Sequence, residues 1–381
     1  MHYTDLHLDL LSAFQTCRQQ TLALIADIDD EVLRTQAHPD FSPVGWHLGH
    51  IAFTESFWIT EYLAKQLPLF SQYEQLFSAD GLPKAERQNL PKLAEILEYL
   101  AKVRSHTLSY LQQHPPNQHP PSEHPPSEQS RLWHWLLQHE SQHAETIAMV
   151  LAMHQQQGKK TPSHLPTVRQ LAAVSTSATD AMTCIEAGPF SQGYDAPQAI
   201  DNERPQHEVV LQQYWISKTP VTIGQYRQFI DLGGYENPKW WSPQGWQWQQ
   251  HAQVSKPLYW TTNPTFDNRP VCGVNWYEAD AYARAIGKRL PTEAEWAKAA
   301  SMISFEAMHS GVWEWTDTWF SGYSGFTPFP YAGYSQTYFD GAHRVLKGSS
   351  WATPHWVKRN SFRNWYHPHR RELFSGFRCA A

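Results

Sequence analysis

Residues 132–154 read LWHWLLQHESQHAETIAMVLAMH, and this stretch decides how the first half of the chain folds. Apolar residues recur in it at spacings of three and four, which predicts a long helix with one buried face. Two histidines share that face, one turn apart, and buried imidazoles need hydrogen-bond partners or a metal ion. The predicted buried face consists of Leu132, Leu136, His139, His143, Ile147, Val150 and His154.

The segment His139–His143 fits the H-E-x-x-H pattern of zinc proteases. The extended protease motif needs glycine and histidine where this chain has Thr146 and Met149. No Asp or Glu follows between residues 146 and 179 to serve as a downstream ligand. Glu140 also points away from the centre of the ligand face. The protease interpretation is therefore weak, while two histidines at i and i+4 remain better explained as metal ligands than as core residues.

A third ligand must come from another helix, and the segment GWHLGHIAF offers the best candidate. His50 shares a helix face with Trp46, Phe53 and Phe57, so we expect it to face inward, with His47 as the alternative one turn earlier. Helix bundles build metal sites from facing helices in this way. Three neutral imidazoles would leave open positions for substrates, and the ligand type alone suits zinc, iron or copper.

Four helical segments joined by polar or proline-rich connections predict a helix bundle over residues 1–155. The proline-rich segment 114–130 is expected to be a solvated loop, because proline cannot continue a helix. Residues 156–180 are polar and broken by Pro and Gly, so we expect them to form a linker. The helical segments are residues 6–28, a segment that starts at Ser42-Pro43 and runs to about residue 65, residues 92–113 and residues 132–154.

Residues 181–381 differ in chemistry from the first half, because most of the 18 Trp, 17 Tyr and 17 Phe fall after about residue 190. Short strand-like runs alternate there with turn residues and a few short helices, which predicts an irregular α+β domain. The strand-like runs are 207–216 and 344–351, and the short helices are 222–232, 276–287 and 292–300.

Composition excludes several classes of protein. A net charge of −6 gives no basic surface, which argues against nucleic acid as a partner. No run of 18 apolar residues predicts a membrane span, and the N-terminus is not typical of a signal peptide. The four cysteines are far apart without a CxxC pair, so we expect a cytoplasmic protein with reduced thiols. The oligomeric state stays open.

Polar groups that could bind a ligand gather near the C-terminus, in RNWYHPHRR at residues 363–371. An arginine there could hold a carboxylate with two hydrogen bonds, and a tryptophan could hold a cation. Tyr331 and Tyr334 lie just upstream, and a phenol near an open metal site can donate a proton or hydrogen bond. By residue type alone, surface packing explains these two tyrosines better.

Residues 287–300, 310–316, 344–353 and 374–379 resemble the domain of formylglycine-generating enzymes, a variant of the C-type-lectin-like fold. Residues 1–155, with SPVGWHLGHIAF and HESQHAE, resemble a DinB-like four-helix bundle. The two halves together resemble the non-heme iron sulfoxide synthases of ergothioneine biosynthesis and their ovothiol relatives. The resemblance implies an α+β multidomain fold and an Fe(II)- and O2-dependent enzyme that joins a thiol to C2 of hercynine, with S-oxygenation.

The resemblance also assigns roles to individual residues. It makes His50, His139 and His143 the iron ligands, and Tyr331 the catalytic tyrosine that donates a proton or hydrogen bond. The residues that it implies for substrate binding are Gln142 at the imidazole, Tyr334, Asn364 and Trp365 near the trimethylammonium group, and Arg370 and Arg87 at the carboxylates of the sulfur donor, with Tyr366 beside them.

Several alternatives stay open. Enzymes of this family that use γ-glutamylcysteine tend to have an acidic residue where this chain has Tyr366, so the donor is cysteine, γ-glutamylcysteine held differently, or a selenium compound. The acceptor is hercynine, or histidine as in ovothiol synthesis. Formylglycine generation is disfavoured because Cys272 and Cys379 do not form a close pair in sequence. A non-catalytic binding protein is the remaining class, and a structural calcium ion in the second domain is not decided.

Overall fold

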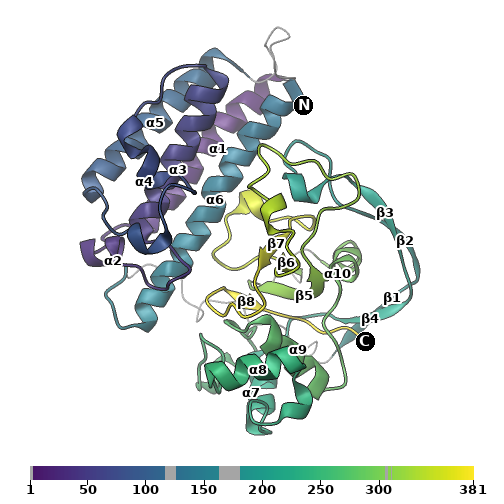
Figure 1. Ribbon diagram of the computed structural model, residues 1–381. Coiled ribbons are helices and arrows are strands. Elements are labelled where there is room, and N and C mark those ends of the chain that lie inside the picture. The colour runs from purple at the N-terminus through teal and green to yellow at the C-terminus, as the bar shows by residue number, and fades with distance from the viewer. Residues whose placement is uncertain (1–2, 116–125, 163–180, 305–307, 310) are drawn as a thin grey trace. The chain divides into compact units, whose positions relative to one another are not determined.

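The computed structural model describes residues 3–115, 126–162, 181–304, 308–309 and 311–381, and the chain divides into two compact units (Figure 1). We call the first the helical unit; it comprises Met1–Leu165 and Pro354–Val357. The second, the mixed unit, comprises Pro166–Thr353 and Lys358–Ala381. Each unit is described by itself below. The expected linker 156–180 falls mostly outside the described residues.

Four long helices, α1, α3, α5 and α6, pack side by side in the helical unit (Figure 1). They form the predicted four-helix bundle, because α1 and α3 each contact both α5 and α6. The elements are α1 (Tyr3–Ala23), α2 (Asp30–Arg34), α3 (Val44–Ser56), the π-helix η1 (Phe57–Leu63), the 3-10 turns η2 (Ser71–Tyr73) and η3 (Lys84–Glu86), α4 (Glu74–Phe77), α5 (Leu93–Gln113), α6 (Pro126–Gln156) and a 3-10 turn η10 (His355–Val357).

Helix α6 is buried on more faces than the sequence pattern indicates. The predicted apolar positions are buried, but so are Trp133, Trp135 and Leu137, which lie outside the predicted face. The helix ends where Gly158 adopts a φ of +77°, and the Lys159 amide donates to the His154 carbonyl. This is the Schellman arrangement that glycine permits. Helix α6 is therefore the central helix of the bundle.

Helix α3 does not continue unchanged to residue 65, because it passes into the π-helix η1 at Phe57. Wider hydrogen-bonded turns, such as the bond from the Ala64 amide to the Ile59 carbonyl, move the following side chains to other faces. Phe57 is 39% exposed, so the prediction that it faces inward is wrong. Trp58 and Ile59 take the buried positions instead.

A buried ion network ties the four long helices together. Arg18 of α1 donates to Glu140 of α6 at 2.7 Å and to Glu55 of α3 at 2.9 Å. Arg104 of α5 donates to both Glu55 oxygens at 2.8 and 2.7 Å, and to Glu140 at 2.5 Å. All four side chains are at most 8% exposed. Each helix of the bundle thus contributes one charge, and no charge is left without a partner of opposite sign.

The mixed unit is built from short strands and helices, as the sequence predicted. Polar side chains start its helices: Thr222, Asn275 and Thr292 each accept a hydrogen bond from the backbone amide three residues later. The elements are β1 (Met182–Ile185), β2 (Gly188–Gln192), β3 (His207–Leu211), β4 (Tyr214–Ser217), α7 (Ile223–Asp231), α8 (Pro243–Ala252), α9 (Trp276–Ala285), α10 (Glu293–Ala300), β5 (Trp313–Trp319), β6 (Arg344–Gly348), β7 (Asn364–Tyr366), β8 (Ser375–Gly376) and the 3-10 turns η6 (Asp201–Glu203), η7 (Pro238–Trp240), η8 (Pro264–Phe266) and η9 (Gln336–Tyr338).

The strands of the mixed unit form three small sheets. β1 pairs with β4, β2 pairs with β3, and a four-stranded sheet has the order β7-β6-β5-β8. All pairs are antiparallel except β5 with β8. Val345 of β6 stands opposite Trp365 of β7, so this register places the residue pair Asn364-Trp365 at the edge of the sheet. The α+β multidomain class is confirmed.

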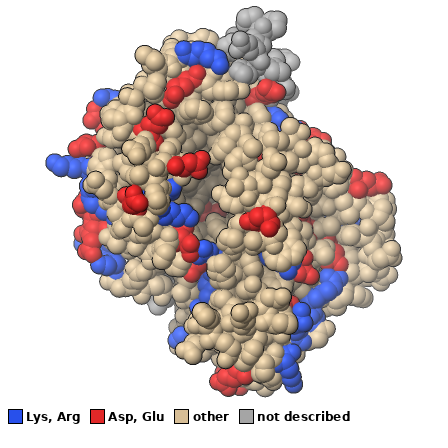
Figure 2. Space-filling model, in the orientation of Figure 1, with Lys and Arg blue, Asp and Glu red and all other residues tan. Residues whose placement is uncertain are grey.

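The surface matches the composition. In the view of Figure 2, basic and acidic side chains are interspersed among uncharged residues, and neither sign dominates the visible face. Among the described helices, none is long and apolar enough to cross a membrane.

Replacing Glu140 by glutamine should destabilise the helical unit, because Arg18 and Arg104 would share the single remaining charge of Glu55. Removing one partner of a buried ion pair costs about 3–5 kcal/mol. We expect a lower urea midpoint for the unfolding transition followed by circular dichroism at 222 nm. Glu98→Gln is the control on α5, because the exposed pair of Glu98 with Lys102 is worth at most about 1 kcal/mol.

The stability difference between the wild type and Glu140→Gln should depend on pH. Burial raises the pKa of Glu140, but the charges of Arg18 and Arg104 outweigh burial and lower it below its usual value. A carboxylate with a lowered pKa stabilises the fold above the pKa of the unfolded chain, about 4.3, and loses this effect as pH falls towards its folded pKa. The stability gap between wild type and Glu140→Gln should therefore narrow below about pH 4. A constant gap down to about pH 3 would contradict the role of the network.

Candidate metal centre and aromatic cluster

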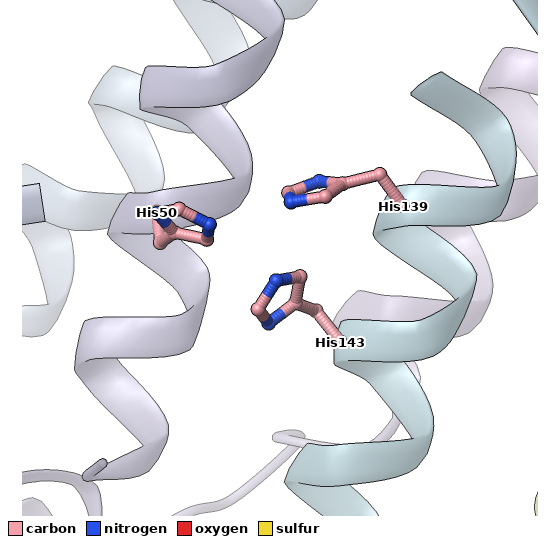
Figure 3. A group of neighbouring side chains, drawn as sticks. All are labelled: His50, His139 and His143. Carbon is pink, nitrogen blue, oxygen red and sulfur yellow. The ribbon is translucent and has the colours of Figure 1, made fainter. Parts of the chain in front are cut away.

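Three histidines come together in the helical unit. His50 projects from α3 towards His139 and His143 of α6 (Figure 3), and one nitrogen of each lies within 4.8 Å of the others. The ring centroids of His139 and His143 are 4.5 Å apart, and His50 lies 5.1 and 4.8 Å from them. This geometry allows three imidazoles on two helices to bind one ion, and the described residues hold no other such group of His, Cys, Asp or Glu.

Burial favours the neutral form of the three imidazoles, because it lowers the pKa of each. Burial lowers the pKa of His50 to about 4. Burial and then the neighbouring imidazoles hold the pKa values of His139 and His143 well below the usual value. Metal ions bind the neutral form of histidine, so these residues need lose no proton to act as ligands.

The ring of His50 is oriented by the backbone. Its Nδ1 lies 2.7 Å from the Phe77 carbonyl oxygen, which fixes the hydrogen on Nδ1 and leaves Nε2 as the ligand atom. The Trp46 ring stacks on it at 4.7 Å. Gly49 permits this contact with α4, because a Cβ at that position would lie 2.1 Å from the Phe77 ring.

His47, the alternative to His50, lies outside the group of three. Its Nδ1 is 3.0 Å from Nδ1 of His143, so it bonds to a candidate ligand. Burial and then the proximity of His50 lower the pKa of His47 to about 3, although the Ser42 carbonyl opposes this effect. The structure thus brings together the three histidines that the sequence analysis favoured, with His47 beside them.

The two polar residues between the paired histidines have different environments. Glu140 is 2% exposed and both of its oxygens accept hydrogen bonds from arginines, so it belongs to the ion network. Glu140 is therefore not a solvated residue on the surface of α6. Gln142 is partly buried and donates from Nε2 to the Gln138 carbonyl at 3.1 Å. Its contact with an imidazole substrate stays a prediction.

Arg87 is buried and bound within the helical unit. Its guanidinium donates to the carbonyls of Leu82 and Ala79 at 2.8 and 2.6 Å, and to Ser42 Oγ at 3.0 Å. The group also packs 4.0 Å from the Trp46 ring. These bonds brace the loop before η3 against α3, and a carboxylate would have to share or replace them. The role of Arg87 in donor binding stays a prediction.

The mixed unit brings three of the predicted aromatic residues together. The rings of Tyr331 and Tyr334 are 6.4 Å apart, and Tyr334 meets the edge of Trp365 at 6.1 Å. Tyr331 is 42% exposed, whereas Tyr334 is buried, so of these two tyrosines it is Tyr331 that presents its ring to solvent. We call Tyr331, Tyr334 and Trp365, together with Phe320 and Tyr338, the aromatic cluster.

Two members of the aromatic cluster were missed by sequence reasoning. Phe320 stacks on Trp365 with centroids 4.5 Å apart and planes inclined by 3°, and Tyr338 lies 5.6 Å from the same ring. Tyr338 could have been found, because it follows Tyr334 by four residues and Tyr331 by seven. Phe320 carries no such signal, since it directly follows β5 and lies far from Trp365 in sequence.

The remaining predicted substrate residues lie on or after β7. Asn364 Oδ1 accepts a hydrogen bond from the Trp365 amide at 3.0 Å, and Tyr366 stands opposite Arg344 in the sheet. Arg370 is half-buried and its backbone amide donates to the His367 carbonyl. The substrate contacts of all three stay predictions.

A buried ion pair holds the start of β7. Arg363 donates to both Glu293 oxygens, at 2.7 and 3.0 Å, and to the Asn202 carbonyl at 2.7 Å. This pair fixes the strand that carries Asn364 and Trp365. Sequence reasoning had grouped Arg363 with possible ligand-binding residues, but its side chain is 1% exposed and is committed to the fold.

Family models match both halves of the chain. The DinB superfamily model matches residues 13–147, and the model of the sulfatase-modifying factor enzyme 1-like domain matches residues 168–303 and 301–381. The order of the two domains agrees with the resemblance derived from the sequence.

Curated relatives match over almost the whole length. The hercynine oxygenases of Mycolicibacterium smegmatis and Mycobacterium tuberculosis are each 34% identical, covering 95% of this chain and 96% of the relative. The ergothioneine biosynthesis protein 1 of Schizosaccharomyces pombe is 28% identical over 44% of this chain and 26% of its own length. With this degree of similarity across both domains, the chain belongs to the hercynine oxygenase family.

Proposed function

We propose that this protein is a hercynine sulfoxide synthase of ergothioneine biosynthesis, which uses Fe(II) and O2 to join a low-molecular-weight thiol to C2 of hercynine. The observation that carries the proposal is the group of three histidines on two helices, in a chain that matches hercynine oxygenases over 95% of its length. The cytoplasmic location expected from the sequence is part of the proposal.

The three histidines suit a catalytic iron centre. His50, His139 and His143 would supply three nitrogen ligands, and ligation by three protein groups leaves positions for substrates. Fe(II), when bound, supplies the activation of O2 and the acidification of the thiol. The carboxylate that could compete for such a site, Glu140, is held by arginines on another face of α6.

The aromatic cluster suits a trimethylammonium group such as that of hercynine. A trimethylammonium group is a permanent cation, and aromatic faces attract such cations without needing a carboxylate. Trp365 and Tyr334 offer this environment, and the exposed Tyr331 offers a phenol that can donate a proton or a hydrogen bond.

The donor site is the less defined part of the proposal. Arg370 would hold a carboxylate of the donor, and the position after Trp365 offers the phenol of Tyr366. A phenol does not pair with an ammonium group as a carboxylate does. Cysteine, γ-glutamylcysteine and a selenium compound therefore all stay candidate donors.

Alanine at any of the three histidines should abolish iron binding, because only two of the three imidazole ligands would be left. We expect iron content, measured by elemental analysis after anaerobic loading, to fall close to zero in His50→Ala, His139→Ala and His143→Ala, and sulfoxide formation to fall with it. His38→Ala, in the helical unit but outside the group, is the control. Unchanged iron content in all three variants would contradict the proposal that these histidines bind iron.

Replacing Tyr331 by phenylalanine should divert the reaction. The ring is exposed, so the loss of its hydroxyl should change stability by less than about 0.5 kcal/mol. Loss of a proton donor reduces a rate by roughly 10²–10⁴-fold. We expect the thiol to be consumed by simple oxidation while the sulfoxide yield falls; Tyr194→Phe, also exposed on the mixed unit, is the control. An unchanged ratio of sulfoxide to oxidised thiol would end the role of Tyr331.

One assay tests acceptor and donor together. Purified protein with Fe(II) is offered hercynine or histidine, each with cysteine or γ-glutamylcysteine, and products are followed by mass spectrometry with O2 consumption. The proposal expects a sulfoxide from hercynine with one of the two thiols. Product only from histidine, or thiol-independent binding without O2 uptake, would replace it with an ovothiol-type enzyme or a binding protein.

A further inference from the structure

We propose that His47 is a positioning residue that orients His143 by accepting a hydrogen bond from its Nδ1, so that His143 presents Nε2 to the metal ion. This inference rests on the proposed metal centre and adds to it a residue from outside the three ligands. The contact that carries it is the 3.0 Å distance between the Nδ1 atoms of His47 and His143.

The proton positions follow from the chemistry of neutral imidazole. Each neutral ring has one N–H and one lone pair, so one of the two Nδ1 atoms donates and the other accepts. Because Nδ1 of His143 is occupied by His47, Nε2 is the nitrogen left to bind an ion, and it needs its lone pair. The hydrogen of His143 must then sit on Nδ1, and His47 accepts it.

This arrangement puts the hydrogen of His47 on Nε2. That atom is buried and makes no hydrogen bond of standard geometry among the described residues. The Ser42 carbonyl acts on the same ring, because it raises the pKa of His47 against the effect of burial. The hydrogen bond of standard geometry that the His47 ring does make is the one to His143.

The same logic applies at His50, where the Phe77 carbonyl does the orienting. At His143 the hydrogen bond of the ring goes to another imidazole, that of His47. Helix α3 supplies the acceptor instead, since His47 and His50 lie three residues apart on one face. The Trp46 ring packs edge-on against His47 at 5.4 Å and stacks on His50. Helix α3 therefore contributes one ligand and orients another.

Two substitutions separate this role from simple packing. In His47→Asn the side-chain oxygen takes roughly the place of Nδ1 and can still accept the hydrogen bond, whereas His47→Leu removes the acceptor. The full chain is prepared without metal and titrated with Co(II), whose visible absorption reports ligand number and geometry. Loss of an orienting partner costs about 10–100-fold in metal affinity.

We expect His47→Leu to lose affinity in that range with an altered Co(II) spectrum, and His47→Asn to retain both. Melting curves of the metal-free proteins check that each variant folds. Wild-type affinity and spectrum in His47→Leu would overturn the inference, as would an equal loss in a folded His47→Asn. If the wild-type chain binds no Co(II), the metal centre itself is overturned, which is a separate failure.

A measurement on the wild type does not depend on how the His47 variants fold. Protein labelled with ¹⁵N at histidine and loaded with Zn(II) should show a slowly exchanging imidazole N–H that disappears in His143→Ala. Its nitrogen should couple through the hydrogen bond to a second imidazole nitrogen, that of His47. A Zn(II)-loaded wild type in which the His143 N–H is seen without this coupling would overturn the inference.

Discussion

The buried ion network of Arg18, Glu55, Arg104 and Glu140 is the constraint on which the helical unit depends. Its charges are costly to bury, and apolar residues of similar size would stabilise a bundle as well or better. The network does what apolar contacts cannot, because directional bonds between four helices tolerate only one rotation of each. Glu140 is next to His139, and Glu55 follows His50 on the same continuous helix. The bonds that fix Glu140 and Glu55 therefore also fix how the histidines face one another.

The grouping of the three histidines was predictable because its residues follow helical spacing. His139 and His143 lie one turn apart on an apolar face, and His50 lies on a predicted helix face that also carries aromatic residues. The ion network was not predictable, because Arg18 and Arg104 belong to amphipathic helices whose charged residues are usually solvated. The π-helix after α3 was also missed, since nothing in FWITEYL distinguishes it from an α-helix.

The aromatic cluster shows a different limit of sequence reasoning. Tyr331, Tyr334 and Trp365 were proposed from a family resemblance, whereas residue type alone favoured surface packing for the tyrosines. Their proximity depends on the pairing of β6 with β7 and on the loop before η9, and neither is visible in periodicity. In an irregular domain with short strands, the register of the strands is fixed by turns and by buried ion pairs, such as that of Arg363 with Glu293. The spacing of apolar residues in the sequence predicts the helices of the helical unit, whereas no comparable pattern predicts the strand pairing of the mixed unit.

The segment HESQH illustrates how packing decides the chemistry of a motif. The i, i+4 spacing that allows two histidines to bind one ion is shared by zinc proteases and by this bundle. In a protease the glutamate must face the metal and act as a base. Here two guanidinium groups hold both oxygens of Glu140 and lower its pKa inside the bundle, so it is not placed to act as a base at the histidines. The third nitrogen comes from His50 instead, and the glutamate serves to set the rotation of the helix that presents the other two.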